Sequence, residues 1–343
     1  MARPLFSCLY SLPKQVIIAS PMNNSQFLSQ CTADAIDKAA SKLKAGHMVA
    51  FPTETVYGLG ADASNEEAVR RIYEVKGRPV DHPLIVHISS MNLLDVWASH
   101  IPEYAIKLAR DYWPGPMTLV LKRTSEARDF ITGGQDSVAI RVPNNPIALS
   151  LLQTFESKGG KGIAAPSANR FGQVSPTSSE DVISELASFL IEEDLILEGG
   201  KCEVGIESTI IDCTSAAPKI LRPGAITKEM IEDSTEINAT EDGLSDIRVS
   251  GALDKHYAPS AKVILDQIPQ FGQGFIALSN SPTPEGVIRI ASPKDIVEFA
   301  QILYDSLRKA DFLELKEVVV TQPIGNGLAI GVRDRLKKAS KGR

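Results

Sequence analysis

The sequence predicts an α/β protein that contains a twisted, mixed open sheet with helices and a second, smaller open α/β domain of Rossmann-like type. Two patterns carry this prediction. Short β-type runs alternate with helical patterns between residues 32 and 227, and prolines in many of the loops favour a mixed sheet over a purely parallel one. A second set of strands and helices begins at about residue 261, after an acidic stretch.

The expected helices of the first region carry start or stop signals. Gly46 ends an apolar-periodic stretch at 32–45, and Ser64 with Glu67 forms a capping box before a helix that runs to about Val75. Asn145 and Pro146 are the N-cap and the first residue of a third helix, and Thr177 with Glu180 caps a fourth. The expected β-type segments are 48–51, 83–88, 113–123, 137–143, 162–169, 210–213 and 219–224. The C-terminal region is expected to contain three strands, a helix at 293–309, a fourth strand and a last helix.

These patterns divide the chain into four parts: an N-terminal extension (1–31), a first domain (32–227), a linker (228–260) and a C-terminal domain (261–343). Residues 228–248 hold seven acidic residues against two cations and show no apolar period, which is typical of a linker. Residues 1–30 contain no acidic residue and are either a plain extension or a targeting peptide, with Met22 as an alternative start.

Composition and charge exclude several classes of protein. The 343 residues carry a formal net charge of −6, so the chain lacks the global basic field of a dedicated nucleic-acid binder, and any anion site must be local. No apolar run approaches the length of a membrane span. The four cysteines, Cys8, Cys31, Cys202 and Cys213, show no CxxC spacing. We therefore expect reduced thiols in a cytoplasmic protein rather than a disulfide framework or a zinc site.

Two motifs invite interpretations that their context does not support. Residues 58–63 fit G-x-G-x-x-A, but TETVY separates the first glycine from the strand that ends at Pro52, whereas a dinucleotide fingerprint needs its turn directly after the strand. No G-x-x-x-x-G-K-[ST] sequence occurs, which excludes a P-loop. His82 and His87 point to opposite faces of an extended segment, so a shared metal ion is not expected.

Several loop segments combine small or hydroxyl residues with isolated cations. They are FPTETVYGLG, KGRP, DSVAIR, APSAN, GIEST and LRPG. Exposed backbone N–H groups, hydroxyls and a few Arg or Lys side chains are what triphosphate recognition requires when there is no P-loop. The segments therefore indicate an anion or nucleotide site, with ordinary surface loops as the alternative.

The same segments, in this order, resemble the motifs of a known family. FPTETVYGLGADA, KGRPVDHPLIVHI, WPGPMTLVL, VAIRVP, AAPSANRFGQVSPT, GIESTIID and LRPG are similar to those of the YrdC/Sua5 family over about residues 35–227. Lys76-x-Arg78 and Ser167-x-Asn169 look like the paired K-x-R and S-x-N motifs of that family. KHYAP (255–259) and the small domain after it resemble the longer Sua5 form, so the resemblance implies a YrdC-like first domain.

The resemblance also implies an activity, that of an L-threonylcarbamoyladenylate synthase, which is a nucleotidyltransferase. Such enzymes combine L-threonine, bicarbonate or CO2, and ATP into threonylcarbamoyl-AMP and pyrophosphate. A partner transferase then moves the threonylcarbamoyl group to adenosine 37 of tRNA. Mg2+ would accompany the ATP phosphates without a protein ligand, and no organic cofactor or membrane is implied. No covalent enzyme intermediate is needed, which agrees with the absence of a nucleophile elbow around Ser167.

Individual residues acquire roles from the same resemblance. The catalytic set near the phosphates would be Lys76, Arg78, Ser167 and Asn169. ATP would contact Arg78, His82, Ser137, Ser167, Ser175, Arg222 and Tyr257, with Tyr257 as a lid. L-Threonine would contact Thr55, His87, Arg141, Ala165 and Ser208, and Arg141 would pair with its carboxylate. His82 departs from the asparagine that many relatives have at this place.

An RNA-binding module is the alternative function, because the concave basic surface of this family is also linked to RNA binding. The net charge and the acidic linker argue against it. The C-terminal segment RDRLKKASKGR could supply a small basic arm for tRNA, or it could be a solvated chain end.

Overall fold

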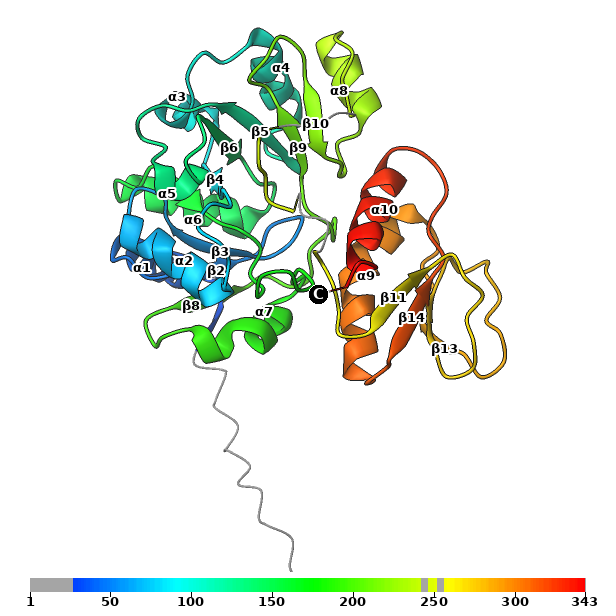
Figure 1. The fold of residues 1–343 in the computed structure, drawn as a ribbon. Helices are drawn as coiled ribbons and strands as arrows, with labels where there is room; N and C mark the ends of the chain where they lie inside the picture. Colours follow the sequence, from blue (N-terminus) through cyan, green and yellow to red (C-terminus); the bar gives the residue numbers. More distant parts are fainter. Residues whose placement is uncertain (1–26, 242–245, 252–255, 343) are drawn as a thin grey trace, which may run out of the picture.

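The structure is a computed structural model that describes residues 27–241, 246–251 and 256–342. Within these residues it contains two sheets, each with its own helices (Figure 1). The expectations for residues 1–26, which include a targeting peptide and a start at Met22, lie outside the described residues, as does Lys255 of KHYAP.

The larger sheet has the strand order β1-β8-β2-β3-β7-β4-β6-β5-β9-β10. Its strands are β1 (Leu28–Gln30), β2 (Val49–Phe51), β3 (Gly58–Asp62), β4 (Ile85–His87), β5 (Met117–Lys122), β6 (Ser137–Arg141), β7 (Ile163–Ala164), β8 (Leu195–Glu198), β9 (Thr209–Asp212) and β10 (Lys219–Arg222). Parallel and antiparallel pairs alternate irregularly: β4 runs parallel to β6 and antiparallel to β7. The predicted mixed sheet is therefore confirmed.

Helices cover both faces of this sheet. They are α1 (Ala33–Lys44), α2 (Glu66–Lys76), α3 (Leu94–Trp97), α4 (Glu103–Tyr112), α5 (Asp129–Thr132), α6 (Pro146–Ser157), α7 (Ser179–Leu186) and α8 (Lys228–Thr235), with short 3-10 turns at Met91–Leu93 and Ala187–Phe189. Alternate residues of β2 point to opposite faces. Val49 and Phe51 join a core formed with α1 and α6, whereas Ala50 joins the core formed with α2 and α4.

The cap of α2 differs from the prediction. Asn65 is the N-cap, and its side chain accepts a hydrogen bond from the Ala68 N–H. The predicted box of Ser64 and Glu67 does not form, because Ser64 belongs to the turn after β3, where its N–H donates to the Asp62 carboxylate. The helix therefore starts one residue later than the sequence pattern indicated.

Two further caps give one confirmation and one correction. Asn145 caps α6 with a proline in the first helical turn, as predicted. Helix α7 begins from Ser178 in a capping box with Asp181, instead of from Thr177 with Glu180. Both pairs have capping chemistry three residues apart, so the sequence did not distinguish between the two registers.

Three stretches of chain hold more structure than predicted. Residues 28–30, assigned to the extension, form edge strand β1 and pair in parallel with β8. Residues 228–235, assigned to the linker, form α8, which Thr227 caps and whose Ile231 is buried in the main core. Strand β3 occupies residues 58–62, where we expected a loop.

Strand β3 was not predicted because it contains two glycines, Gly58 and Gly60, and glycine has low strand propensity. A Cβ atom at Gly60 would lie 2.7 Å from the Ile163 side chain and 2.8 Å from the Phe51 ring. The neighbouring strands thus approach β3 so closely that a larger residue at this position would displace them.

The smaller sheet has the order β11-β14-β12-β13, and its strand pairs are all parallel. Its elements are β11 (Lys262–Leu265), β12 (Gly274–Ile276), β13 (Ile288–Ala291), β14 (Glu317–Val320), α9 (Ile296–Phe312) and α10 (Leu328–Ala339). This arrangement confirms the predicted open α/β domain. Helices α9 and α10 lie on the side that faces the larger domain (Figure 1). The apolar cluster that contains Phe299 and Val332 of these helices also contains Val56 and Ile206 of the larger domain, so the two domains share one core.

Membrane and cysteine expectations can be compared with the described residues only. None of the helices in these parts of the chain is long and apolar enough to cross a membrane. Cys31, Cys202 and Cys213 are free, and Cys8 lies outside the described residues. Burial raises the pKa of Cys31 to about 11 and that of Cys202 to about 12, so both thiols stay protonated near neutral pH.

Candidate active site

One pocket lies where the loops of the larger sheet meet the segment that leads into the C-terminal domain. It is lined by the connection between β2 and β3, the residues around the end of α2, the loop after β7, the residues before β9, and by Ser250, Gly251, His256 and Tyr257. The pocket brings together eleven of the predicted residues: Thr55, Lys76, Arg78, His87, Arg141, Ala165, Ser167, Asn169, Ser208, Arg222 and Tyr257. His82, Ser137 and Ser175 are not part of its lining.

Arg141 is fixed at one end of the pocket. The parallel register of β4 and β6 places Arg141 beside His87. Its Nη1 donates to the Thr55 hydroxyl at 2.9 Å and its Nε to the Gly115 carbonyl at 3.3 Å. Its Nη2 lies 2.7 Å from the carboxylate of Glu54, and both side chains are buried. This end therefore presents a guanidinium that is already held in position for a second carboxylate.

His87 is neutral in this setting. Burial, and then the charge of Arg141, lower the pKa of His87 to about 3. Its Nδ1 is buried and has no hydrogen-bond partner among the described residues. The ring packs edge-on against Phe51, with 6.0 Å between the ring centroids. The imidazole can thus exchange a hydrogen bond with a polar ligand without carrying a charge of its own.

Lys76 joins the K-x-R segment to the S-x-N segment at the other end of the pocket. Helix α2 ends at Lys76, and Gly77 follows with a φ of 61°, a conformation that glycine adopts at no steric cost. Lys76 Nζ donates to the Ser167 carbonyl at 2.6 Å and also to the Asn169 carbonyl. Burial, and then the charge of Arg78, lower the pKa of Lys76 well below its usual value.

Arg78 lies beside Lys76 and reaches the segment that covers the pocket. Its Nη2 donates to the Pro83 carbonyl at 2.9 Å and to the Ser250 hydroxyl at 3.1 Å. Burial lowers the pKa of Arg78 to about 10, which leaves the guanidinium charged near neutral pH. Its Cζ lies 5.7 Å from the centroid of the Phe171 ring. Two nearby buried cations that pair with no carboxylate of the described residues are suited to bind a polyanion.

His82 contributes its backbone rather than its imidazole. The His82 carbonyl accepts a hydrogen bond from Arg78 Nε at 3.4 Å and one from the Tyr73 hydroxyl at 3.2 Å. The ring is half-buried and packs edge-on against Phe171, with 5.4 Å between centroids. Since Phe171 lines the pocket, the ring of His82 supports the pocket wall from behind.

Asn169 and Ser208 offer further polar atoms. Asn169 Nδ2 donates to the carbonyls of Arg170 and Gln173, while its Oδ1 is buried and has no partner among the described residues. Ser208 Oγ lies 2.7 Å from the Thr118 hydroxyl and accepts from Arg222 Nη2 at 3.1 Å. A ligand in the pocket would therefore meet a free amide oxygen on one wall and a fixed hydroxyl on another.

Ser137 and Ser175 lie behind the pocket walls. Ser137 starts β6, four residues before Arg141, so the rise of a strand places it roughly 13 Å away along the chain. It lines a small neighbouring cavity with Ile85 and Val249. Ser175 donates from its hydroxyl to the carboxylate of Glu207 at 2.6 Å. The structure thus places neither serine on the surface where the other predicted ATP contacts meet.

Residues 256–257 close one side of the pocket. Tyr257 is buried, and its ring stacks on Tyr304 of α9 with 5.6 Å between centroids. Its hydroxyl has no partner among the described residues. Burial lowers the pKa of the neighbouring His256 to about 3, so this imidazole is also neutral. The predicted lid residue therefore lies in contact with the C-terminal domain.

Sequence reasoning missed two buried acids and one buried cation of this region. Glu54 belongs to FPTETVYGLG and Glu207 to GIEST, segments from which we took only hydroxyl residues and cations. The available signal was an acidic residue inside a loop segment that otherwise supplied predicted site residues. The cation is Arg335, which the sequence placed in a possible basic arm. That interpretation is wrong for Arg335, which is fully buried, and for Lys338, which donates to the Gly251 carbonyl at 2.7 Å.

No group of three or more His, Cys, Asp or Glu side chains in the described parts of the chain could hold a metal ion. This result includes His82 and His87, which the sequence already separated.

Comparison with known proteins gives two consecutive family matches. Residues 41–224 match the family described as "Telomere recombination", which groups Sua5, YciO and YrdC, and residues 226–341 match "Threonylcarbamoyl-AMP synthase, C-terminal domain". The chain belongs to the YrdC/Sua5 family. The order of the two matches is that of the two-domain Sua5 form.

Relatives in this family cover nearly the whole chain. The threonylcarbamoyl-AMP synthase of Pyrococcus abyssi is 40% identical over 322 residues, which are 88% of this chain and 93% of the relative. That of Bacillus subtilis is 38% identical over 90% of this chain and 93% of the relative. The crystal structure of P. abyssi Sua5 complexed with L-threonine superposes with a TM-score of 0.82 at 38% identity, over 92% of this chain and 96% of that one.

Proposed function

We propose that this Sua5-type protein is a threonylcarbamoyl-AMP synthase that converts L-threonine, bicarbonate or CO2, and ATP into threonylcarbamoyl-AMP and pyrophosphate. One observation carries the proposal. A single pocket has a fixed guanidinium, Arg141, at one end, and at the other it has two cations, Lys76 and Arg78, that pair with no carboxylate in the described part of the chain. An amino acid and a triphosphate fit these two ends. The names of the Pyrococcus and Bacillus relatives agree with this assignment.

The end formed by Arg141 would bind L-threonine. The substrate carboxylate would accept hydrogen bonds from the guanidinium, and Thr55 and Ser208 would border the side chain together with Ala165. The neutral His87 would contribute a hydrogen bond without repelling the ammonium group. The ammonium must lose one proton before its nitrogen can attack CO2, and the nitrogen loses a second proton after that attack to give a carbamate anion.

The end formed by Lys76 and Arg78 would bind the triphosphate. A carbamate oxygen attacks the α-phosphorus of ATP, a new P–O bond forms, and the bond to the pyrophosphate oxygen breaks. Because nucleophile and electrophile are both anionic, the two cations would offset their repulsion and hold them in line. A phosphate beside Lys76 favours its charged form and so opposes the effect of burial on its pKa.

The remaining parts of the proposal concern the wider reaction. Mg2+ would enter as the complex with ATP and supply positive charge to the phosphates. A tRNA threonylcarbamoyl transferase would consume the product, which places the chain among nucleotidyltransferases that serve tRNA modification in the cytoplasm. Residues 32–227 would form the catalytic domain and Tyr257 the lid. Ser137 and Ser175 would act through the pocket walls, since they do not line the pocket.

Pyrophosphate release is the test of this function. We expect release from ATP to require both L-threonine and bicarbonate, and the adenylate product to contain carbon from labelled bicarbonate. L-2-Aminobutyrate, which differs from L-threonine only by the missing hydroxyl group, serves as the matched control and should support little release. Release that proceeds equally without L-threonine or without bicarbonate would refute the proposal.

A further inference from the structure

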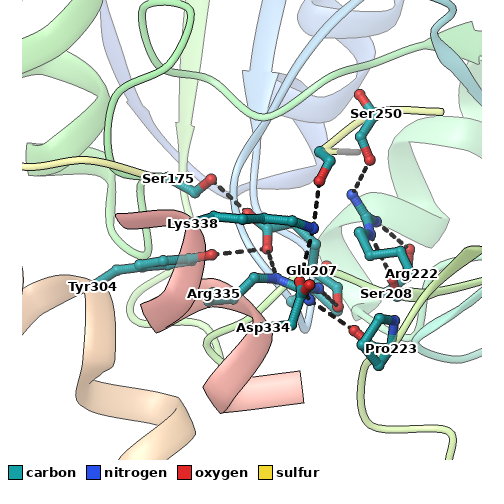
Figure 2. Close-up of polar contacts among 12 residues, drawn as sticks. Ser175, Glu207, Ser208, Arg222, Pro223, Ser250, Tyr304, Asp334, Arg335 and Lys338 are labelled. Carbon is teal, nitrogen blue, oxygen red and sulfur yellow. Dashed lines mark hydrogen bonds and ion pairs between the residues drawn. The ribbon is translucent and has the colours of Figure 1, made fainter. Parts of the chain in front are cut away.

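A buried charge cluster joins the pocket wall to the last helix of the C-terminal domain (Figure 2). Its centre is Glu207, the acid of GIEST, which lines the pocket. The Glu207 carboxylate accepts hydrogen bonds from Ser175 at 2.6 Å, from Tyr304 at 2.8 Å and from Arg335 Nε at 2.9 Å. Tyr304 belongs to α9 and Arg335 to α10, so two of these three donors come from the C-terminal domain.

Arg335 also holds a second motif of the pocket. Its Nη1 donates to the Pro223 carbonyl in LRPG at 2.7 Å, and its Nη2 donates to the Glu207 carbonyl at 3.1 Å. One guanidinium therefore connects GIEST with LRPG. The neighbouring residues in these motifs, Ser208 and Arg222, line the pocket and bond to each other through Arg222 Nε and Nη2.

The negative charge of Glu207 at the pocket wall is compensated by the positive charge of Arg335. A carboxylate in the wall of a pocket repels a triphosphate, and the repulsion is strong where water is excluded. Arg335 has no exposed surface, and its charge lies against Glu207. Asp334, which also contacts Arg335 at 2.8 Å, is half-exposed and is bridged by Lys338 at 2.9 Å. The pair at the pocket wall is thus close to neutral only while α10 is in place.

We infer that Arg335 is a positioning residue for the nucleotide site, supplied by the C-terminal domain. It neutralises Glu207 and fixes the GIEST and LRPG motifs, so that Ser208 and Arg222 face the bound triphosphate. The inference rests on the proposed use of ATP. It assigns to the second domain a direct part in nucleotide binding, in addition to the lid.

Four variants test this role: Arg335→Gln, Glu207→Gln, the double variant, and Arg333→Gln as the matched control. Arg333 also lies on α10, but its Nη1 donates to the Pro323 carbonyl within the C-terminal domain. For each variant, kcat and the KM values for ATP and L-threonine are measured by pyrophosphate release, and folding is followed by thermal unfolding.

We expect Arg335→Gln to raise KM for ATP at least tenfold, with a change of about threefold or less in KM for L-threonine, because the unneutralised carboxylate of Glu207 acts on the more highly charged substrate. Glu207→Gln should leave KM for ATP within about threefold, and the double variant should recover most of the loss, since the glutamine amides can bond to each other. Arg333→Gln should behave like the unchanged protein.

Three results would overturn the inference. In the first, Arg335→Gln lowers the amount of active enzyme but leaves KM for ATP unchanged, which is the behaviour of a purely structural residue. In the second, the double variant binds ATP as poorly as Arg335→Gln, so that neutralising Glu207 plays no part. In the third, Arg333→Gln has the same effect as Arg335→Gln.

Two measurements keep the test decisive. If Arg335→Gln does not fold, it is replaced by Arg335→Lys, because lysine keeps the charge but cannot reach Glu207 and Pro223 together. An unchanged KM for ATP in Arg335→Lys would refute the role of the guanidinium in fixing the two motifs. Direct titration with a fluorescent ATP analogue separates this inference from the proposed function. If the unchanged protein binds ATP but its pyrophosphate release does not require L-threonine, the proposed function fails. The effect of Arg335 on ATP affinity can still be measured in that case.

Discussion

Replacing Arg141 separates a substrate contact from a structural ion pair. In the structure the guanidinium bonds to Thr55 and lies against the buried carboxylate of Glu54. In the proposed complex, Arg141→Gln would remove two charge-assisted hydrogen bonds to the threonine carboxylate, which together would contribute roughly 3 kcal/mol. Since about 1.4 kcal/mol corresponds to a factor of ten, KM for L-threonine should rise roughly 100-fold, while KM for ATP changes about threefold or less.

The same substitution should also reduce stability. It leaves Glu54 buried without its partner, and breaking a buried ion pair in this way costs about 3–5 kcal/mol. The double variant Glu54→Gln/Arg141→Gln removes the unpaired charge and should recover most of the free energy of unfolding. It should not recover the affinity for L-threonine, because the guanidinium is still missing.

Two assays check this reasoning: pyrophosphate release at varied L-threonine and ATP, and urea unfolding of the single and double variants. Equal changes in the two KM values would show that Arg141 supports the whole pocket rather than one substrate. Recovery of L-threonine affinity in the double variant would refute the role of Arg141 in binding the carboxylate.

Three other predictions concern the rest of the site. Lys76→Met should lower kcat at least 100-fold in pyrophosphate release, because it removes a cation from the phosphates and releases the carbonyls of the S-x-N segment; an unchanged kcat would contradict this role. Burial alone would raise the pKa of Glu207, but the charges of Arg335 and Arg222 lower it from 4.5 to about 2. The ionised carboxylate should therefore stabilise the fold by about 3 kcal/mol above pH 4.5, and this stabilisation should be lost as the pH falls toward 2. In urea unfolding, the free energy of unfolding of Glu207→Gln should fall less steeply between pH 4.5 and pH 2 than that of the unchanged protein. Tyr257→Ala should raise KM for ATP, whereas Tyr257→Phe should have little effect, since the hydroxyl has no partner among the described residues; equal effects of both would contradict a role for the ring.

The parts of the fold that depend on local chemistry could be predicted from the sequence. Asn145 with its proline marked the start of α6, and the acidic stretch marked the region between the two α/β units. Strand β3 was missed because Gly58 and Gly60 have low strand propensity, and the glycine at position 60 is explained only by the close approach of Phe51 and Ile163. Helix α8 was missed because the acidic residues of 228–235 outnumber its two apolar residues that pack on the main core, Met230 and Ile231.

The candidate site divides in a similar way. Lys76 and Arg78 could be selected as an anion site because they are cations on a short turn next to a proline. The bonds from Lys76 to the carbonyls of Ser167 and Asn169 could not be predicted, since they depend on how β7 places a loop more than 90 residues away in the sequence. Arg335 was beyond sequence reasoning for a related reason. A basic segment near a chain end is normally predicted to be exposed to solvent. Only the packing of α10 against the larger domain shows that this arginine is buried.

The apolar cluster shared by Val56, Ile206, Phe299 and Val332 makes the two sheets one thermodynamic unit. Separating the domains would expose this surface to water and would leave Glu207 without Arg335, so each domain should be less stable alone than in the full chain. The chain should therefore melt in one calorimetric transition, with equal van't Hoff and calorimetric enthalpies, in spite of its two sheets. An exchange of C-terminal domains between relatives would succeed only if the residues of this shared core were exchanged with them.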